Sequence, residues 1–258
     1  MTVAPPVHVA MVRPPRAFVT HSIAGLHAAP DETSELVDQA QFGEALTTLG
    51  GSGGWLYVQG EDLYFGWIER RLVRMDTHPR RELLVAAHNA TLRREPNDAS
   101  EVIGDVAAGV AGHEVRQGWV RCATGWVAVT DTVPADRLPQ RYPTPDDLLA
   151  TAESFLGVPY LWGGTSAHGI DCSGLTQRVY LLNGVGLDRD ADQQALGGRP
   201  VDQARPGDLF FFGTDRVTHT AIATGERTFI HAPESGKIVQ RGELTDASRL
   251  RAVRRYLP

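Results

Sequence analysis

An internal repeat at a constant offset of 66 residues limits how the first half of this 258-residue chain can fold. Residues 26–37 and 92–103 share leucine, proline, serine and glutamate at equivalent places, and each copy is followed by two Gly-Trp pairs. Short β-branched or aromatic runs separated by Gly, Pro, Asp and Asn are typical of small strands joined by tight turns. Two copies are too few for a solenoid. We therefore predict two small β-barrels, over about 17–76 and 82–132.

The second half of the chain has a different pattern. A proline-rich stretch at 133–144 is predicted to be an extended linker. Thr144 and Pro145 are suited to begin a helix, and a second helix is expected from about Cys172. Strand-like runs follow at 208–212, 218–223, 229–231 and 238–240. Helices followed by a series of strands indicate an α+β domain with an antiparallel sheet, over 145–258.

Cys172 is the strongest candidate for chemistry, because it follows a glycine-rich loop and opens an apolar-periodic segment. At a helix N-terminus the unpaired N–H groups and the helix dipole stabilise a thiolate, which makes the cysteine a nucleophile. The other cysteine, Cys122, fits a buried small hydrophobe. A bridge between the two would silence the nucleophile, so we expect two free thiols and a reducing compartment.

A cysteine nucleophile needs a base within hydrogen-bond reach, and the base needs a group that orients it. His219 and His231 lie on two of the predicted strands, with a turn between them. Neighbouring strands would place the two imidazoles together beneath the Cys172 helix. We expect one imidazole to take the thiol proton and the other to hold the first in the required tautomer.

Composition excludes several classes of protein. The net charge of −6 gives no electrostatic support to a nucleic-acid partner. No run approaches the ~18 apolar residues of a membrane span. Residues 1–8 lack the basic and apolar segments of a secretory signal, so we expect a cytoplasmic protein, taken to be a monomer. No zinc-type cluster or P-loop is present in the sequence, and we expect no metal or cofactor.

The motifs of the second half occur in a specific order: Pro159–Ser166, Gly169–Leu175, Arg205–Phe212, His219–Ala223 and Ile230–Ala232. Together they resemble the NlpC/p60 family of papain-like cysteine peptidases, over roughly 145–255, and the repeats resemble bacterial SH3 domains. The resemblance implies hydrolysis of cell-wall peptides at the γ-D-glutamyl–diamino acid bond. It implies Cys172 as nucleophile, His219 as base and His231 as orienting residue. Tyr160 would stabilise the oxyanion together with the backbone N–H of Cys172.

Two SH3-like domains before the peptidase domain resemble one subgroup, the murein-recycling γ-D-glutamyl-L-diamino acid endopeptidases. There, a tyrosine of the first SH3 domain and nearby acidic groups restrict cleavage to peptides with a free N-terminal L-Ala. Tyr64 is the candidate tyrosine, and its alternative is an ordinary barrel aromatic. Asp171, Asp190 and Glu44 are candidate partners for the ammonium, with Ser173 adding a hydrogen bond. The alternative for Asp171 is a helix cap, and for Glu44 a solvated turn charge.

The sequence therefore predicts a cysteine peptidase that releases L-Ala-D-Glu from murein-derived peptides. Ala191 stands where the subgroup often carries serine, which puts one substrate hydrogen bond in doubt. Three alternatives stay open. They are an exported wall-lytic endopeptidase held on murein by its SH3 domains, a murein-binding module without catalysis, and an amidase or acyltransferase with the same thiol chemistry.

Overall fold

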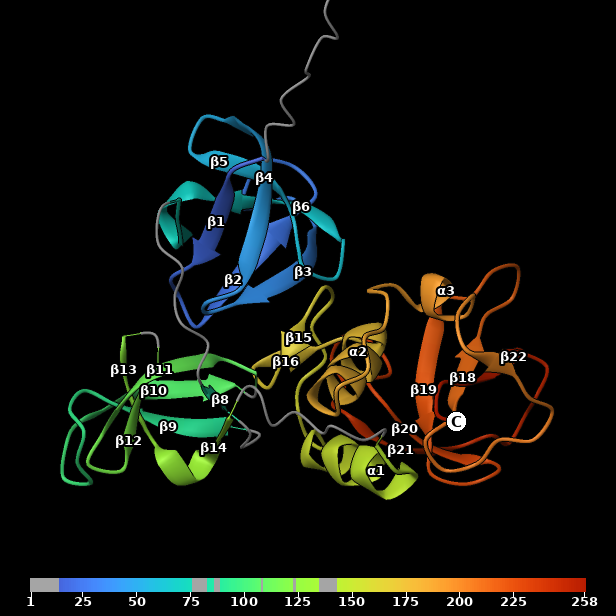
Figure 1. The fold of residues 1–258 in the computed structure, drawn as a ribbon. Coiled ribbons are helices and arrows are strands. Elements are labelled where there is room, and N and C mark those ends of the chain that lie inside the picture. Colours follow the sequence, from blue (N-terminus) through green and yellow to red (C-terminus); the bar gives the residue numbers. More distant parts are fainter. Residues whose placement is uncertain (1–13, 76–82, 86–88, 108, 123, 135–142) are drawn as a thin grey trace, which may run out of the picture.

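The computed structural model describes residues 14–75, 83–85, 89–107, 109–122, 124–134 and 143–258. Figure 1 shows three parts: two β domains, in blue and green, and a C-terminal domain of helices and strands in yellow to red. This arrangement confirms the predicted fold class. Most of the predicted linker, residues 135–142, lies outside the described residues.

The first β domain is a seven-stranded antiparallel sheet with the strand order β3-β2-β6-β5-β4-β1-β7. Its core contains Leu26, Leu46, Val58 and Ile68, each at most 1% exposed. Alternate residues along the strands point inward, as expected for strands with one buried face. The strands are β1 (Arg16–Val19), β2 (Ile23–His27), β3 (Leu36–Gln41), β4 (Ala45–Ser52), β5 (Trp55–Gln59), β6 (Phe65–Glu69) and β7 (Val73–Arg74).

The second β domain repeats this topology, with the order β10-β9-β13-β12-β11-β8-β14. Strands β9 and β10 begin 66 residues after β2 and β3, so the sequence repeat is a structural repeat. Cys122 lies in the core of this domain as a free, fully buried thiol, as predicted. The strands are β8 (Leu83–Val85), β9 (Asn89–Arg93), β10 (Val102–Ala107), β11 (Ala111–Arg116), β12 (Trp119–Cys122), β13 (Gly125–Ala128) and β14 (Thr132–Pro134).

The C-terminal domain has a six-stranded antiparallel sheet with the order β17-β22-β18-β19-β20-β21. Its helices are α1 (Pro145–Ser154), α2 (Cys172–Leu182) and the short α3 (Ala191–Gln194). A two-stranded ribbon, β15 (Thr165–Ser166) and β16 (Gly169–Ile170), precedes α2. The sheet strands are β17 (Arg199–Pro200), β18 (Leu209–Phe212), β19 (His219–Ala223), β20 (Thr228–His231), β21 (Gln240–Glu243) and β22 (Leu250–Arg255).

Helices α1 and α2 cover one face of this sheet. Leu148 and Phe155 from the α1 region and Leu175 and Val179 from α2 share a core with inward residues of β18, β19 and β20. Helix α1 begins as predicted, because Thr144 and Asp147 form a reciprocal capping box. Packing on the sheet fixes α2, and with it the residue at its N-terminus.

One predicted strand is displaced. The run at 238–240 was expected to be a sheet strand, but β21 begins at Gln240. Residues 237–239 pair instead with the segment before the glycine-rich loop: Ile238 bridges Pro159, and Tyr160 N donates to Lys237 O at 2.8 Å. The backbone groups of 237–239 therefore bond to the segment that carries Tyr160 and not to a sheet strand. Across the part of the chain described, no helix has the length and apolar character needed to cross a membrane.

Candidate active site

Cys172 occupies the first turn of α2, as predicted, and is 8% exposed. Asp171 caps the helix, since its Oδ1 accepts from Gly174 N at 2.7 Å. Gly174 is required here because a Cβ would lie 2.2 Å from Gly164 O. The glycine-rich loop therefore packs directly against the first turn and presents the sulfur at its edge.

The electrostatics of Cys172 differ from the prediction. Burial raises the pKa of the thiol to about 11, and the neighbouring Asp171 carboxylate adds to the rise. The backbone N–H groups of Thr220 and Ser173 act in the opposite direction but are outweighed. The N–H group of Ser173 at the helix N-terminus therefore acts in the expected direction, but the predicted net lowering of the thiol pKa is wrong for the free protein, because desolvation of a thiolate exceeds the stabilisation that the N–H groups give.

Two histidines face each other on adjacent strands beside Cys172. His219 begins β19 and His231 ends β20, and His219 Nε2 lies 2.8 Å from His231 Nδ1. Burial lowers the pKa of both imidazoles to about 4, so both are neutral at neutral pH. With Nε2 of His219 engaged by His231, Nδ1 of His219 is the nitrogen that remains for the thiol proton. In the tautomer that protonates Nε2, His219 donates to His231 Nδ1 and keeps Nδ1 as an acceptor, which is the arrangement that a base and its orienting group require.

Tyr160 completes the group around the sulfur. It lines both cavities that contain Cys172, and burial raises the pKa of its hydroxyl, which therefore stays a proton donor. The N–H groups of the first turn of α2 have no acceptor within the helix. A phenol and a backbone N–H beside the sulfur are the kinds of donor that a developing oxyanion needs.

Two cavities meet at Cys172 and Tyr160. The sheet-side cavity has a volume of about 450 Å³ and contains the two histidines. The barrel-side cavity, of about 290 Å³, lies between α2 and the first β domain and is lined by Tyr64, Asp190 and Arg216. A substrate that crosses both cavities would place its scissile bond at the sulfur.

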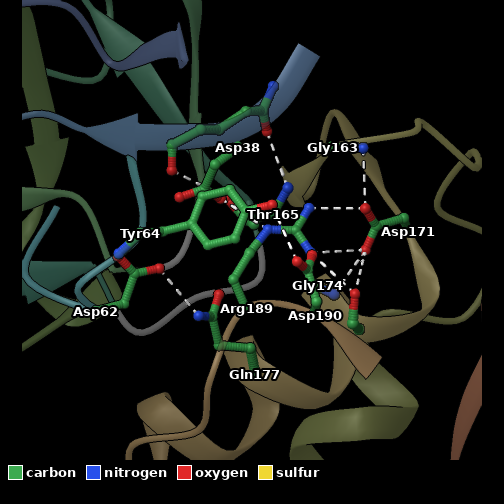
Figure 2. A network of polar contacts seen from close by, with 12 residues as sticks. Asp38, Asp62, Tyr64, Gly163, Thr165, Asp171, Gly174, Gln177, Arg189 and Asp190 are labelled. Atoms are coloured by element: carbon green, nitrogen blue, oxygen red, sulfur yellow. Dashed lines mark hydrogen bonds and ion pairs between the residues drawn. The ribbon is translucent and has the colours of Figure 1, made fainter. Parts of the chain in front are cut away.

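A buried ion cluster joins the first β domain to this site (Figure 2). Arg189, 2% exposed, donates through Nε to Asp38 Oδ1 of β3 at 2.8 Å and through Nη2 to Asp171 Oδ2 at 2.7 Å. Ser173 Oγ accepts from Arg189 Nη1 at 3.0 Å. Two carboxylates raise the pKa of Arg189, so the guanidinium is permanently charged. The cluster fixes the helix cap next to the nucleophile to a strand of another domain.

Tyr64, from the first β domain, lines the barrel-side cavity. Its hydroxyl donates to Asp190 Oδ2 at 3.0 Å, a contact between residues 126 positions apart in the sequence (Figure 2). Leu63 precedes it with a φ of 70°, a conformation that costs a non-glycine residue about 1–2 kcal/mol. Asp62 holds this turn, since its Oδ1 accepts from Tyr64 N and its Oδ2 from Gln177 of α2. The strained turn thus aims the tyrosine at Asp190.

Further hydrogen bonds hold the first β domain against the glycine-rich loop. Trp162 Nε1 donates to Glu35 Oε1 at 2.7 Å, and Thr165 N donates to Gln39 Oε1 at 3.0 Å. Gly163 N donates to Asp171 Oδ2 at 2.9 Å. Gly163 has a φ of 74°, and a Cβ there would lie 2.2 Å from Leu36 O. The backbone of the loop therefore contacts β3 without an intervening side chain.

Some predicted site residues have other surroundings than expected. Glu44 does not line either cavity at Cys172. It lies in a separate cavity between both β domains and α2, because it follows β3 at the end remote from the nucleophile. Asp171 lines the barrel-side cavity, but both of its oxygens already accept from Arg189 and backbone N–H groups. Asp190 Oδ2 accepts from Tyr64, and the Asp190 side chain also takes part in a capping box with Gln193 at the start of α3.

Two residues of the site were not predicted. Arg189 carries no signal in the sequence beyond its position before Asp190, because its partners come from a strand far away in the chain. Glu35 lines the barrel-side cavity and belongs to the repeated Ser-Glu pair of the β domains. Across the described residues, no group of three or more His, Cys, Asp or Glu side chains is arranged to hold a metal ion.

Comparison with known proteins agrees with this geometry. Residues 157–254 match the NlpC/P60 family, and residues 26–71 match the bacterial dipeptidyl-peptidase SH3 domain. The γ-D-glutamyl-L-lysine dipeptidyl-peptidase of Bacillus subtilis is 29% identical over 240 residues, which cover 84% of this chain and 80% of that protein. Dipeptidyl-peptidase 6 of Lysinibacillus sphaericus is 29% identical over 255 residues, or 89% and 92% of the two chains.

The fold is shared with a solved structure. The crystal structure of an NlpC/P60 family protein from Bacillus cereus has a TM-score of 0.82 and 25% identity to this chain. The match covers 94% of this chain and all of that one. It therefore includes both β domains and the domain with the cysteine.

Proposed function

Because the chain belongs to the NlpC/P60 cysteine peptidases that carry an N-terminal bacterial SH3 domain, we propose that it hydrolyses the γ-D-glutamyl–L-diamino acid bond of murein peptides. Its substrates carry a free N-terminal L-Ala, and its product is the dipeptide L-Ala-D-Glu. The names of the Bacillus relatives, γ-D-glutamyl-L-lysine dipeptidyl-peptidases, support this bond and this diamino-acid class.

The observation that carries the proposal is the Tyr64–Asp190 pair in the wall of the barrel-side cavity. The two side chains bond to each other in the lining, and we infer that this pair closes the cavity to the substrate chain and forms its closed end. A carboxylate in a half-buried position favours an ammonium partner over a neutral group, because an unpaired buried charge is costly. A free N-terminal ammonium can pair with the carboxylate at this end of the cavity. An N-acylated peptide has no charge there and needs more space.

A second feature supports a γ-linked D-glutamate. This residue keeps a free α-carboxylate, which needs a cation in the cavity. Arg189 is already engaged by Asp38 and Asp171. Arg216 also lines the cavity, and it has no ion-pair partner among the residues described. We infer that Arg216 receives the α-carboxylate, a contact that Ala191, which has no hydroxyl, does not make.

The reaction follows from the positions of the side chains. Sγ of Cys172 attacks the γ-carbonyl carbon while Nδ1 of His219 takes the thiol proton, and Tyr160 and the backbone N–H of Cys172 stabilise the oxyanion. The C–N bond then breaks, and His219 returns its proton to the leaving amine. Water, deprotonated by His219, attacks the carbonyl carbon of the thioester that remains. The C–S bond then breaks, His219 returns the proton to Sγ of Cys172, and the dipeptide leaves with a new carboxyl group. His231 holds His219 in the tautomer that each step uses.

A cleavage assay tests the proposal. L-Ala-γ-D-Glu-L-Lys is incubated in free and N-acetylated form with the protein and with the Cys172→Ala variant, and the products are identified by mass spectrometry. We expect L-Ala-D-Glu from the free form alone, and none from the variant. Equal cleavage of both forms would reject recognition of the amine, and cleavage of neither would reject the function.

We also propose that the protein acts in the cytoplasm. The support is chemical. Both cysteines are free thiols, and one of them is the proposed nucleophile, which an oxidising compartment could oxidise. Fractionation of the source cells with an antibody to the chain tests this placement. Recovery with the cell wall or the medium would contradict it.

A further inference from the structure

The sheet-side cavity carries charges of both signs that do not pair with one another. Glu234, Glu243, Asp246 and Arg249 line it together with Cys172 and the two histidines. None of the three carboxylates lies within ion-pair distance of Arg249, and all four side chains are solvent-exposed. Asp246 accepts hydrogen bonds from Ser248, whereas Glu234, Glu243 and Arg249 have no side-chain partner among the residues described.

These charges lie at defined places relative to the reacting atoms. Arg249 contributes to lowering the pKa of His219, so its guanidinium lies near the imidazole that protonates the leaving amine. Glu234 contributes to raising the pKa of Tyr160, so its carboxylate lies on the tyrosine side of the same cavity. Glu234 follows His231 by three residues, with Pro233 between them restricting the backbone. A cation and an anion therefore line the same cavity as the sulfur, the cation near His219 and the anion near Tyr160.

The leaving group of the proposed reaction has the complementary charges. A diamino acid at the end of a peptide carries its α-carboxylate one carbon from the scissile nitrogen, and an ammonium at the end of its side chain. The scissile nitrogen must approach His219 to be protonated, which brings the α-carboxylate towards Arg249. The side chain then extends into the cavity, where the carboxylates outnumber the cation.

We propose that Arg249 binds the free α-carboxylate of the departing diamino acid and that Glu234 binds its side-chain ammonium. The preferred substrate thus ends at the diamino acid, and longer peptides, in which this carboxylate is an amide, are cleaved more slowly. This inference rests on the proposed function, because it names the residues that select the leaving group of that reaction.

Matched substrates and variants test the two contacts separately. The substrates are L-Ala-γ-D-Glu-L-Lys, its C-terminal carboxamide and its norleucine analogue, and kcat/KM is measured for each. The carboxamide removes the negative charge, and norleucine removes the ammonium at nearly constant length. We expect the parent peptide to be preferred about tenfold over each analogue, the ratio that one charged hydrogen bond supplies.

The variants should remove one preference each. Arg249→Gln should bring the ratio of kcat/KM for the parent peptide to kcat/KM for the carboxamide close to 1. Glu234→Gln should bring the ratio of kcat/KM for the parent peptide to kcat/KM for the norleucine analogue close to 1. Each variant should have the same kcat/KM as the wild type for the analogue that lacks the charge its substituted residue would bind. Glu226→Gln, at an exposed turn outside the cavity, removes the same charge as Glu234→Gln and should alter neither ratio. Equal losses on all three substrates, or no preference in the wild type, would overturn the proposal.

A binding measurement separates this inference from the reaction itself. Free L-lysine, L-lysinamide and L-norleucine are titrated into the Cys172→Ala protein by calorimetry, with and without the Arg249 and Glu234 substitutions. Tighter binding of lysine than of either analogue, lost in the matching variant, would support the contacts even if no peptide were cleaved. Equal binding of all three would reject the contacts while leaving the peptidase proposal intact.

Discussion

At the scale of single residues, burial determines the chemical state of this site more than local sequence does. The sequence places Cys172 at a helix N-terminus, where a low thiol pKa is expected, but the pKa is raised because the sulfur is enclosed. The two imidazoles are held neutral for the same reason. The free protein therefore contains a neutral thiol beside a neutral base, and charge separates only when substrate is attacked.

The raised pKa of Cys172 predicts how alkylation depends on pH. Because the thiol pKa lies above its ordinary value, at about 11, the thiolate fraction should rise about tenfold per pH unit from pH 7 to 10. Iodoacetamide labelling followed by peptide mass spectrometry measures the rate at each cysteine. Cys122, fully buried with a pKa of about 12, is the internal comparison and should react more slowly throughout. A rate at Cys172 that is already constant between pH 5 and 8 would instead indicate a thiolate–imidazolium pair.

Arg189 is the residue whose loss should cost most stability. Arg189→Met leaves Asp38 and Asp171 buried without their cation, which destabilises by about 3–5 kcal/mol near neutral pH. Burial already raises the pKa of Asp38 to about 7, and loss of the cation raises it further in the folded variant. The folded variant therefore binds more protons than the folded wild type, and its loss of stability should be smaller at pH 5 than at pH 8. Urea denaturation at the two pH values measures this. Arg71→Met, which removes an exposed ion pair with Glu69, should change stability little at either pH.

At the scale of elements, the parts fixed by local chemistry were predictable. Helix α1 begins at its expected cap and α2 at Cys172, since capping residues and apolar spacing act over a few positions. The run at 238–240 was misplaced because a distant segment, 157–160, supplies its hydrogen-bond partners. The sequence of the run itself does not indicate that its backbone will pair with so distant a segment.

The glycine-rich loop gives a prediction at this scale. Gly163→Ala forces a Cβ against Leu36 O and should displace the loop from β3, which opens the closed end of the site. We expect the N-acetylated peptide to gain cleavage relative to the free one. Gly157→Ala is the matched control, because Gly157 has a similar φ of 88° but no atom within 4 Å of the added Cβ. Both variants should lose about 1 kcal/mol from backbone strain, while only Gly163→Ala should change selectivity.

At the scale of the whole molecule, the site is a joint product of two domains, and this is where sequence reasoning failed. Tyr64 was identified only through a family resemblance, and its partner Asp190 lies 126 residues away. Glu44 was a predicted partner of the ammonium and Glu35 was not, although Glu35, directly before β3, lines the cavity and Glu44, beyond the end of β3, does not. Which end of β3 meets the other domain is decided by docking, and neither repeat nor charge pattern encodes it.

The tyrosine tests this shared construction. Tyr64→Ala should open the closed end and allow cleavage of the N-acetylated peptide, whereas Tyr64→Phe keeps the ring and removes only the bond to Asp190. We expect Tyr64→Phe to raise KM for the free peptide a few-fold and to keep the N-acetylated peptide excluded. Tyr57→Phe, which removes the hydroxyl of another aromatic in the same sheet, serves as control for both assays. Continued exclusion of the N-acetylated peptide by Tyr64→Ala would show that another group limits the length of the substrate.

The ion cluster that ties β3 to the helix cap has an evolutionary consequence. Bond-breaking groups sit on one folding unit, while part of the wall that decides which chain ends are admitted sits on another. Mutations in the two units are therefore not independent: a change at Asp38 in β3 removes a partner of Arg189, which holds the helix cap beside Cys172. Tyr64 is the freer route to a new substrate range, because its side chain bonds to Asp190 and to none of the reacting groups.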